Sequence, residues 1–382
     1  MTGELISVIT FWLAMAGLIY TFIGYPVLIY SLSKARPRPV RKADTFPRVS
    51  LIIAAYNEER VIHEKLRNCF AMTYPRGQLE IIVVADGSSD RTAEIVAGWS
   101  GRGVQLMHEP ARRGKSAALN RAVPHAEGEI VFFSDANTHY PPDVIEKMVS
   151  NFSDSTVGGV SGRKVLLQDL ERHATRGETA YWGYESILKS CESSLGSIVT
   201  ADGEIFALRK SLYEPIPDGF VHDDMFLTLS MVERGYRVVY ESEATSAEHA
   251  SRGLWDEFHL KVRYASAGYQ VLKAFAPLLM PPRSLFALQF ISHKVFRWMA
   301  PFFLIAALVS SGVAGGPFYS TLFVLQIAFY AVALAGMAIQ RWVPIKLTYF
   351  PLYFCLGNTA ALWGAFKYLF AGQSTLWRKA AR

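Results

Sequence analysis

A long uncharged run near the start of the chain limits what the chain can fold into. The segment Ile6–Leu32 contains no charged residue and exceeds the roughly 20 residues that a helix needs to cross hydrocarbon. A cleavable signal peptide would be shorter and would begin with basic residues. Only Glu4 precedes the run, whereas five basic residues follow it, namely Lys34, Arg36, Arg38, Arg41 and Lys42. The positive-inside rule then places the N-terminus outside and the following domain in the cytoplasm.

The composition agrees with a membrane protein that carries a soluble part. Of 382 residues, 51% are hydrophobic and only 19% are charged, against about 25% charged in an ordinary soluble domain. The net charge is +6, but no dense basic face or nucleic-acid-binding motif is visible. We therefore expect membrane lipids and a diphosphate as partners, and no nucleic acid. The three cysteines are scattered and predict neither a disulfide framework nor a metal site.

The last hundred residues turn apolar again. Candidate membrane spans are Phe302–Ala314, Phe318–Ile339 and Leu347–Phe366. The stretch Ser284–Met299 mixes apolar and basic residues, which suits either a helix in the headgroup plane or the wet start of the next span. We therefore predict three parts, namely an N-terminal transmembrane helix (1–36), a soluble domain (37–283), and an interfacial helix with transmembrane helices (284–382).

One plus three spans would leave the C-terminus outside. The basic residues Arg378, Lys379 and Arg382 favour the inside instead. A re-entrant last segment, helped by Pro351 and Gly357, would resolve this conflict, and the sequence leaves both arrangements open.

The soluble part alternates short apolar runs with helical, charged stretches. This alternation predicts a parallel α/β sheet. The predicted helices are Arg60–Phe70, a helix after Asp90 that runs to Trp99, and Ser116–Val123. The predicted strands are Arg48–Ala54, Glu80–Ala85, Val104–His108 and Glu129–Ser134.

Acidic residues follow two of these strands. Asp86 comes after Ile81–Ala85, and Asp135 comes after Ile130–Ser134. Carboxylates at the carboxyl ends of parallel strands project into the crevice where ligands bind in such sheets. A third acidic site, Asp223–Asp224, lies further along the chain. Together these sites predict a pocket that binds a charged ligand together with a metal ion.

Five motifs in order carry a resemblance to a known family. They are Ala55-Tyr56-Asn57-Glu58, Asp86-Gly87-Ser88-Ser89-Asp90, Gly114-Lys115-Ser116-Ala117-Ala118-Leu119-Asn120, Asp135-Ala136-Asn137 and Asp223-Asp224. This set, within residues 47–268, resembles the family 2 glycosyltransferases with a GT-A fold. More narrowly, the chain is similar to membrane-integrated bacterial members related to exopolysaccharide, cellulose, hyaluronan and chitin-oligosaccharide synthases. The resemblance implies a Rossmann-like mixed α/β sheet in a cytoplasmic domain flanked by transmembrane helices.

The resemblance also implies a nucleotide-sugar site. Asp86 would accept a hydrogen bond from N3–H of uracil, which favours a UDP-sugar, because an ionised carboxylate only accepts. Ala54, Tyr56 and Glu58 would line the base and ribose, and Lys115 at a helix start would meet phosphate oxygens. The structural alternatives are a charge near a helix N-terminus for Asp86, a packed loop aromatic for Tyr56 and a solvated surface residue for Lys115.

A divalent cation, Mg²⁺ or Mn²⁺, is implied at Asp135. Mg²⁺ takes hard oxygen ligands and keeps several waters, so one or two carboxylates suffice. The family usually has a second aspartate two residues on, where this chain has Asn137. The amide oxygen of Asn137 can ligate but adds no charge. His249 is a further candidate ligand, or a structural histidine.

The catalytic roles follow from the same resemblance. Asp224 would be the general base that deprotonates the acceptor hydroxyl, with Asp223 as its competitor. Where processive relatives carry Gln-x-x-Arg-Trp, this chain has Leu260-Lys261-Val262-Arg263-Tyr264. Arg263 would face the leaving diphosphate, and Tyr264 would stack on the acceptor sugar. Asp202 either shapes the acceptor pocket or forms a turn.

These residues predict an inverting glycosyltransferase, facing the cytoplasm from the inner membrane as a multi-pass protein. It would move one or a few sugars from a nucleotide-sugar to a lipid-linked or oligosaccharide acceptor in polysaccharide biosynthesis. The alternatives are a processive polysaccharide synthase, or a catalytically silent nucleotide-sugar sensor. A transporter would need more spans and repeated halves. The sequence leaves a homo-oligomer open.

Overall fold

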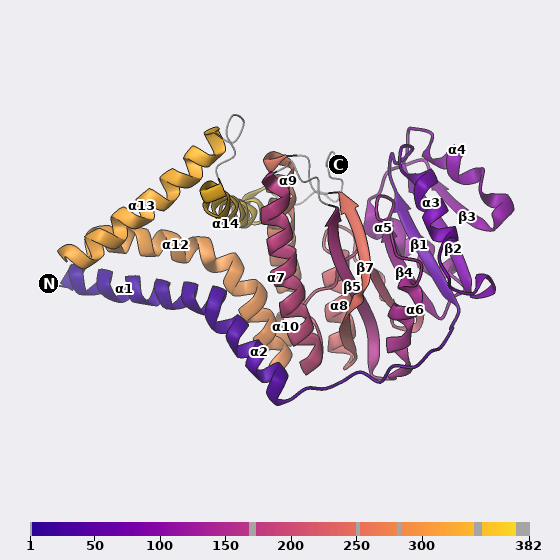
Figure 1. Cartoon of the computed structure of the whole chain (residues 1–382), viewed down its shortest axis with the longest axis horizontal. Helices are drawn as coiled ribbons and strands as arrows, with labels where there is room; N and C mark the ends of the chain where they lie inside the picture. Colours follow the sequence, from indigo (N-terminus) through magenta and orange to yellow (C-terminus); the bar gives the residue numbers. More distant parts are fainter. Residues whose placement is uncertain (1, 168–172, 250–252, 281–283, 340–345, 372–382) are drawn as a thin grey trace.

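The computed structural model describes residues 2–167, 173–249, 253–280, 284–339 and 346–371. The molecule is elongated, with an α/β domain at one end and long apolar helices at the other (Figure 1). The N-terminus lies at the far end of the apolar helices, away from the sheet. The predicted division into membrane and soluble parts is therefore visible as two regions of one chain.

A seven-stranded mixed sheet forms the core of the α/β domain. Its strand order is β3-β2-β1-β4-β6-β5-β7. The first four strands are parallel, β6 runs antiparallel to both β4 and β5, and β5 is parallel to β7. The four predicted strands are confirmed to within one residue at either end. The strands are β1 (Val49–Ala55), β2 (Leu79–Asp86), β3 (Val104–Glu109), β4 (Ile130–Asp135), β5 (Val157–Leu167), β6 (Phe206–Arg209) and β7 (Arg237–His249).

Helices cover both faces of this sheet, and the predicted helices in the first half are confirmed to within two residues at either end. The helix predicted to reach Trp99 ends at Ala97, and its first turn is capped by Asp90, whose Oδ1 accepts from the backbone N–H of Thr92 at 3.0 Å. The α-helices here are α3 (Ile62–Phe70), α4 (Thr92–Ala97), α5 (Lys115–Ala122), α6 (Val144–Val149), α7 (His173–Leu195), α8 (Asp223–Glu233), α9 (Leu254–Ala274) and α10 (Ala276–Leu279). Short 3-10 turns are η2 (Arg76–Gln78), η3 (Ser100–Arg102), η4 (Val123–His125), η5 (Ser150–Ser153) and η6 (Lys210–Leu212).

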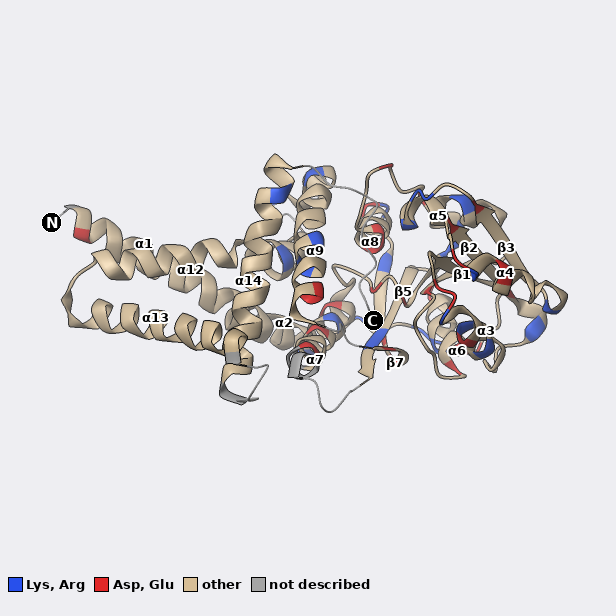
Figure 2. Cartoon of the chain, turned by 90° about the horizontal axis from the view of Figure 1, so that it is seen from above, with Lys and Arg blue, Asp and Glu red and all other residues tan. Residues whose placement is uncertain are grey.

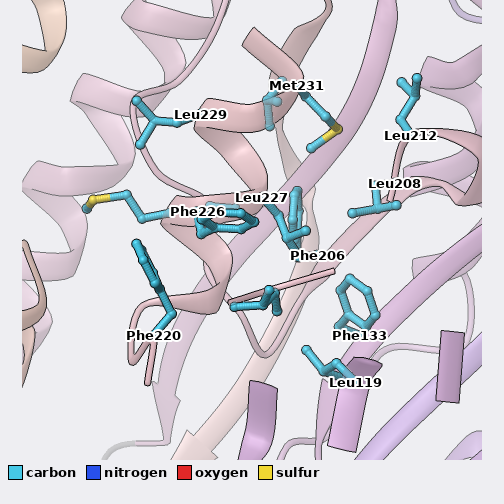
Figure 3. Packing of buried hydrophobic residues seen from close by; sticks show 14 of the residues in the cluster. Leu119, Phe133, Phe206, Leu208, Leu212, Phe220, Phe226, Leu227, Leu229 and Met231 are labelled. Atoms are coloured by element: carbon cyan, nitrogen blue, oxygen red, sulfur yellow. The ribbon is translucent and has the colours of Figure 1, made fainter. Parts of the chain in front are cut away.

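Alternate residues of the central strands feed two separate cores. Leu51 and Ile53 of β1 belong to one buried cluster, and Ile52 belongs to the other. This follows from the two-residue period of a strand, which sends neighbouring side chains to opposite faces. On the α8 face, Phe133 and Phe206 lie close to the helix (Figure 3). Since burial of such a side chain stabilises the fold by about 1.5–3 kcal/mol, this face fixes where α8 begins.

Three helices of the described chain are long and apolar enough to cross a membrane. They span Gly3–Ala35, Leu285–Val313 and Gly316–Ala338. Figure 2 shows that the bundle of α1, α12 and α13 is almost free of charged residues, which gather on the other side of α9. The first run consists of α1 (Thr2–Ile19), the π-turn η1 (Tyr20–Gly24) and α2 (Tyr25–Ala35). The others are α11 (Leu285–Phe290), the π-turn η7 (Ile291–Val295) and α12 (Phe296–Val313), followed by α13 (Gly316–Ile339).

The region after the α/β domain differs from the sequence prediction in two ways. The predicted interfacial stretch Ser284–Met299 is continuous with α12, which agrees with the alternative that it is the start of a span. The predicted span Leu347–Phe366 does form a helix, α14 (Lys346–Phe370), but α14 is not among the three membrane-length apolar helices. Two helices of this kind therefore follow the domain among the described residues, and a further span at α14 stays a prediction. Tyrosines and Asn358 make α14 less apolar, and α14 packs closely on α9, where a Cβ on Gly364 would lie 2.7 Å from Cβ of Ala265.

Polar contacts join the apolar helices to the α/β domain through α7. Glu185 of α7 forms ion pairs with His293, with Lys294 at 3.4 Å and with Arg297. Seven residues further along α7, Glu192 accepts a hydrogen bond from the Tyr25 hydroxyl at 2.6 Å. All of these contacts are made at the inner ends of the long helices, next to the two π-turns, so α7 holds the membrane helices at a fixed place on the domain.

Gly268 gives a test of the close packing between α9 and α12. A Cβ at this position would lie 2.3 Å from the buried Trp298 ring, whereas a Cβ at Gly183 of α7 would meet nothing within 4 Å. We expect Gly268→Ala to destabilise the protein by about 1–3 kcal/mol through overpacking. The matched Gly183→Ala should leave stability unchanged or raise it by up to about 1 kcal/mol. Thermal unfolding in detergent measures both, and equal midpoints for the two variants would contradict the packing described.

Candidate functional site

The carboxyl edge of the parallel strands brings the first two acidic residues together. Asp86 is the last residue of β2 and Asp135 is the last residue of β4. Both strands flank β1, in which Ala54 pairs with Asp135 and Ala55 pairs with Ala85. The two carboxylates therefore lie at the same edge of the sheet, on either side of one strand. This arrangement agrees with the expected crevice.

Asp86 is a rigidly held, buried carboxylate. Its Oδ2 accepts from the backbone N–H groups of Arg113 at 3.0 Å and Gly114 at 2.7 Å. Its Oδ1 lies 3.5 Å from Nη2 of Arg121 and forms no hydrogen bond within the described residues. Gly114 has φ of 94°, a conformation that favours glycine, and this turn aims both N–H groups at Asp86. One carboxylate oxygen is thus used by the protein, and the other is not hydrogen-bonded.

The loops after β1 and β2 are tied together beside Asp86. The backbone N–H of Asn57 donates to Oγ of Ser88 at 3.1 Å, and the backbone N–H of Glu58 donates to Oγ1 of Thr92 at 2.8 Å. The Arg112 guanidinium lies 3.7 Å from the centre of the Tyr56 ring. Ala54, Tyr56 and Glu58 therefore do lie at the edge that carries Asp86 and Asp135.

Lys115 connects the strand edge to the acidic pair at the start of α8. Its Nζ lies 2.8 Å from Oδ1 of Asp135, 3.8 Å from Oδ2 of Asp223 and 3.2 Å from the carbonyl oxygen of Gly203. Burial alone would lower the pKa of Lys115, but the attraction of Asp135 and Asp223 outweighs burial and raises this pKa above its usual value. The lysine is therefore a permanent cation at the centre of the site, not a solvated surface residue.

Asp224 and Asp223 have opposite ionisation behaviour. Burial raises the pKa of Asp223, and the neighbouring Asp224 adds to this, against the opposing effect of Lys115. Burial would also raise the pKa of Asp224, but His222, Lys115 and the backbone N–H of Met225 together lower it to about 2. Asp224 is therefore the member of the pair that stays ionised at neutral pH.

The geometry of Asp224 leaves one of its oxygens available. Oδ1 accepts from the backbone N–H of Met225 at 2.7 Å and lies 2.8 Å from Nδ1 of His222. Oδ2 faces Gly203, since a Cβ built on that glycine would lie 3.4 Å from Oδ2 and 3.4 Å from Nζ of Lys115. Oδ2 therefore lies on the side of Asp224 that faces Gly203, and not on the side held by His222 and Met225.

Helix α9 supplies the aromatic and basic residues expected near the base. The Tyr264 ring stacks on His222 with 5.3 Å between ring centroids, and 37% of Tyr264 is exposed. The Arg263 guanidinium lies 5.5 Å from the centre of the Tyr264 ring. The structure thus brings Arg263 and Tyr264 next to Asp224 from a distant part of the sequence.

Asp202 has a strong partner within the protein. Its carboxylate lies 2.6 Å from Nζ of Lys189 on α7, and only 7% of the residue is exposed. The backbone N–H of Asp202 donates to Oγ of Ser161 at 2.9 Å. These contacts fix the turn that carries the Gly203 carbonyl to Lys115. The role of Asp202 in the acceptor pocket stays a prediction.

The residues predicted to hold a cation fit a site that the donor would complete. Asp135 is 35% exposed at its side chain, and its Oδ1 faces Lys115. Asn137 directs its Nδ2 to Glu248 at 3.4 Å, and His249 is exposed at the end of β7. Among the described residues, no three His, Cys, Asp or Glu side chains are arranged to hold a metal ion. A hard cation here would therefore take one carboxylate from Asp135 and most other ligands from a diphosphate and water.

Sequence reasoning missed several residues that build the site. His222, Lys189 and Arg121 were not singled out, although each contacts a predicted aspartate. A histidine two residues before Asp224 was a local signal that could have been used. The contacts of Lys189 and Arg121 depend on the packing of α7 and α5, and no motif marks them. Cys69, Cys191 and Cys355 are free thiols in the structure.

Lys115 can be tested through the pH dependence of stability. In Lys115→Met, the carboxylates of Asp135, Asp223 and Asp224 lose the cation that attracts all three. Their mutual repulsion then raises their folded-state pKa values above those of the unfolded chain. Such groups destabilise the fold at neutral pH and stop doing so as pH falls through the raised values. We expect a loss of about 3 kcal/mol at pH 7.5 and a clearly smaller loss at pH 5, measured by thermal unfolding. The control is Lys147→Met, since Lys147 forms a half-exposed ion pair with Asp143 at 2.7 Å and should cost under about 1 kcal/mol. A loss in Lys115→Met that does not depend on pH would contradict this role.

The sequence and the fold are similar to those of known proteins. Residues 50–216 match the model of Glycosyl transferase family 2. A beta-monoglucosyldiacylglycerol synthase of Trichormus variabilis is 30% identical over 265 residues, which are 65% of this chain and 55% of that protein. A poly-beta-1,6-N-acetyl-D-glucosamine synthase of Staphylococcus aureus is 28% identical over 254 residues, which are 64% of this chain and 59% of that protein. The chain thus spans little more than half the length of these relatives.

A solved structure is similar over almost the whole chain. It is a mannosyltransferase from Pyrobaculum calidifontis in complex with GDP-Man and Mn²⁺, with a TM-score of 0.71 and 27% identity, and the match covers 94% of this chain and 99% of that one. The predicted α/β fold of the GT-A class is confirmed by this likeness and by the family match. Residues 50–216 therefore resemble glycosyl transferase family 2 within a domain of the GT-A fold, and membrane-length apolar helices lie before and after this domain.

Proposed function

We propose that the chain is an inverting glycosyltransferase that moves a sugar from a nucleotide-sugar to an acceptor at the membrane surface. The observation that carries the proposal is the Lys115 bridge, which joins Asp135 at the sheet edge to the acidic pair of α8. Donor-binding and acceptor-activating carboxylates need to lie in one site, and Lys115 brings Asp135 and the acidic pair of α8 to a single side chain. The family 2 match of residues 50–216 supports the same reaction class.

In this mechanism Asp224 is the general base. Its Oδ2 accepts the proton of the acceptor hydroxyl, the hydroxyl oxygen forms the new bond to the sugar carbon, and the bond to the diphosphate breaks on the opposite side. Asp224 is ionised at neutral pH and can accept a proton, but its lowered pKa makes it a weak base, so its role rests on the position of Oδ2. Lys115 and Arg263 supply positive charge for the departing diphosphate. A divalent cation, Mg²⁺ or Mn²⁺, would neutralise further negative charge on the diphosphate, with Asp135 as its ligand from the protein and Asn137 as a candidate second one.

The alternative function, a catalytically silent nucleotide-sugar sensor, has less support. A sensor needs no ionised carboxylate held in a fixed orientation, whereas Asp224 is ionised at neutral pH and is held at Oδ1 by His222 and the backbone N–H of Met225. The acceptor side favours a short product over a long polymer, because Leu260 and Tyr264 depart from the motif of processive relatives. The similarity to a monoglucosyldiacylglycerol synthase agrees with a lipid acceptor that receives one or a few sugars.

The arrangement of apolar helices supports a cytoplasmic active site on the inner membrane. One apolar helix precedes the domain and two follow it. With the domain inside, two following spans return α14 to the cytoplasmic side. This topology removes the conflict between the span count and the basic residues near the C-terminus, and it agrees with the packing of α14 on α9.

The base role predicts a clear separation between binding and turnover. We expect Asp224→Asn to lower sugar transfer by about 10²- to 10⁴-fold while donor affinity stays within about 3-fold. The exposed Asp143→Asn is the matched control and should behave as the wild type. Transfer is measured with radiolabelled UDP-glucose, UDP-GlcNAc and GDP-Man on diacylglycerol and native membrane lipids, and the product is sized. Full activity in Asp224→Asn would remove Asp224 from the base role, and a long polymer would favour the processive alternative.

The nucleobase preference follows from the oxygens of Asp86. Because Oδ2 is used by two backbone N–H groups, only Oδ1 remains for a base. Uracil offers one N–H in its imide, whereas guanine offers an N–H and an adjacent amino group that suit a carboxylate with both oxygens free. We expect UDP to bind at least about 10-fold more tightly than GDP in calorimetry with Mn²⁺. Tighter binding of GDP would contradict the uracil assignment and would match the donor present in the similar mannosyltransferase structure.

A further inference from the structure

His222 is the side chain that contacts both the proposed base and the proposed acceptor platform. Its Nδ1 lies 2.8 Å from Oδ1 of Asp224, and its ring stacks on Tyr264 at 28° between the ring planes. The residue precedes α8, where its carbonyl accepts the backbone N–H of Phe226 at 3.0 Å. The ring is therefore fixed from three sides, by the helix start, by the carboxylate and by α9.

The hydrogen bond to His222 decides which oxygen of Asp224 is left for substrate. An ionised carboxylate only accepts, so Nδ1 of His222 carries the hydrogen in this contact. The backbone N–H of Met225 binds the same oxygen, Oδ1, at 2.7 Å. Two donors on Oδ1 fix the plane of the carboxylate and direct Oδ2 towards Gly203 and Lys115. A backbone donor alone fixes one point on the carboxylate and leaves rotation of the side chain open.

The other charged groups around Asp224 act from a different side. Lys115 on α5 faces Oδ2 and is shared with Asp135 on β4 and Asp223 on α8. Arg263 on α9 lies behind Tyr264, over the ring face of that tyrosine. Among these groups, His222 alone is placed in hydrogen-bonding distance of Oδ1 by its side chain.

We propose that His222 is a positioning residue for Asp224, holding Oδ1 from the Tyr264 side so that Oδ2 faces the acceptor hydroxyl. This inference rests on the proposed function, because it assigns a partner to the base of that reaction. It gives the stacked pair of His222 and Tyr264 one purpose, which is to couple the aromatic surface for the acceptor to the orientation of the base. A change in the contact between the acceptor and Tyr264 would then alter the orientation of Asp224 through the ring of His222.

Two substitutions separate the two contacts of His222. Phenylalanine keeps a ring against Tyr264 and removes the hydrogen bond, whereas asparagine loses the ring and keeps an N–H donor near the position of Nδ1. We expect His222→Phe to lower kcat by about 30-fold, a part of what a general base contributes, with the KM for the donor within about 3-fold. His222→Asn should recover most of the lost kcat. The exposed His125→Asn is the matched control and should not change kcat.

The pH dependence distinguishes positioning from a purely structural effect. His222 contributes to keeping the pKa of Asp224 low, so its loss raises that pKa and moves the acid limb of kcat/KM to higher pH in His222→Phe. The same change in the pKa of Asp224 can be measured without turnover, through the stability of the fold. A depressed carboxylate pKa stabilises the fold above the unfolded-state pKa of about 3.9, and this stabilisation is lost as pH falls through the folded-state value. The gap in unfolding temperature between wild type and His222→Phe should therefore be constant from pH 7 to about pH 5 and narrow as pH falls below about 4.

These measurements separate failure of the inference from failure of the proposed function. If the wild type transfers sugar from none of UDP-glucose, UDP-GlcNAc and GDP-Man, the proposed function fails, and the unfolding data still test the His222–Asp224 contact. The inference is overturned if His222→Phe keeps wild-type kcat, if His222→Asn is no better than His222→Phe, or if the gap in unfolding temperature does not depend on pH.

Discussion

The site depends on one buried cation that several carboxylates share. Lys115 begins α5, immediately after the glycine turn that fixes Asp86, and its Nζ reaches Asp135, Asp223 and the Gly203 carbonyl. Without this ammonium, the edge of β4 and the start of α8 would hold like charges at short range in a partly dry crevice, at a cost of several kcal/mol. With it, elements from four separate parts of the chain form one site, and the strong attraction keeps the cation charged.

The fold was predictable where local sequence carries the signal. The strands of the first half end within one residue of their predicted positions, because each is a short apolar run that stops at a polar residue such as Asp86 or Asp135. The mixed second half and the contacts of Lys189 and His222 were not predictable in the same way. They depend on which helix packs beside which strand, and that choice is made by buried surfaces such as the Phe133 and Phe206 cluster. The place of α14 was not predictable in the same way, since it packs on α9 at Gly364 and also exposes Phe350 and Trp363.

The membrane helices and the site are connected through α7. On one side Lys189 holds Asp202 and with it the turn that carries Gly203, and on the other side Glu185 holds Arg297 and the residues beside the π-turn η7. Charged groups in such a place are expensive unless they are paired, so each pairing fixes the relative position of the parts it joins. The result is that the acceptor side of the site and the inner ends of the apolar helices are set by the same helix. An acceptor that reaches the site along the bilayer surface would meet the Gly203 turn in a position already fixed relative to the apolar helices.

Asp86 and Asp224 have different proposed tasks but follow the same physical rule. In each, the protein binds one carboxylate oxygen with two donors, the backbone N–H groups of Arg113 and Gly114 in the first case and those of Met225 and His222 in the second. The bound oxygen fixes the orientation of the group, and the other oxygen keeps its capacity to accept. A free carboxylate would rotate and would offer both oxygens to water. Holding one oxygen therefore makes the second one selective, for a single base N–H at Asp86 and for a single hydroxyl proton at Asp224.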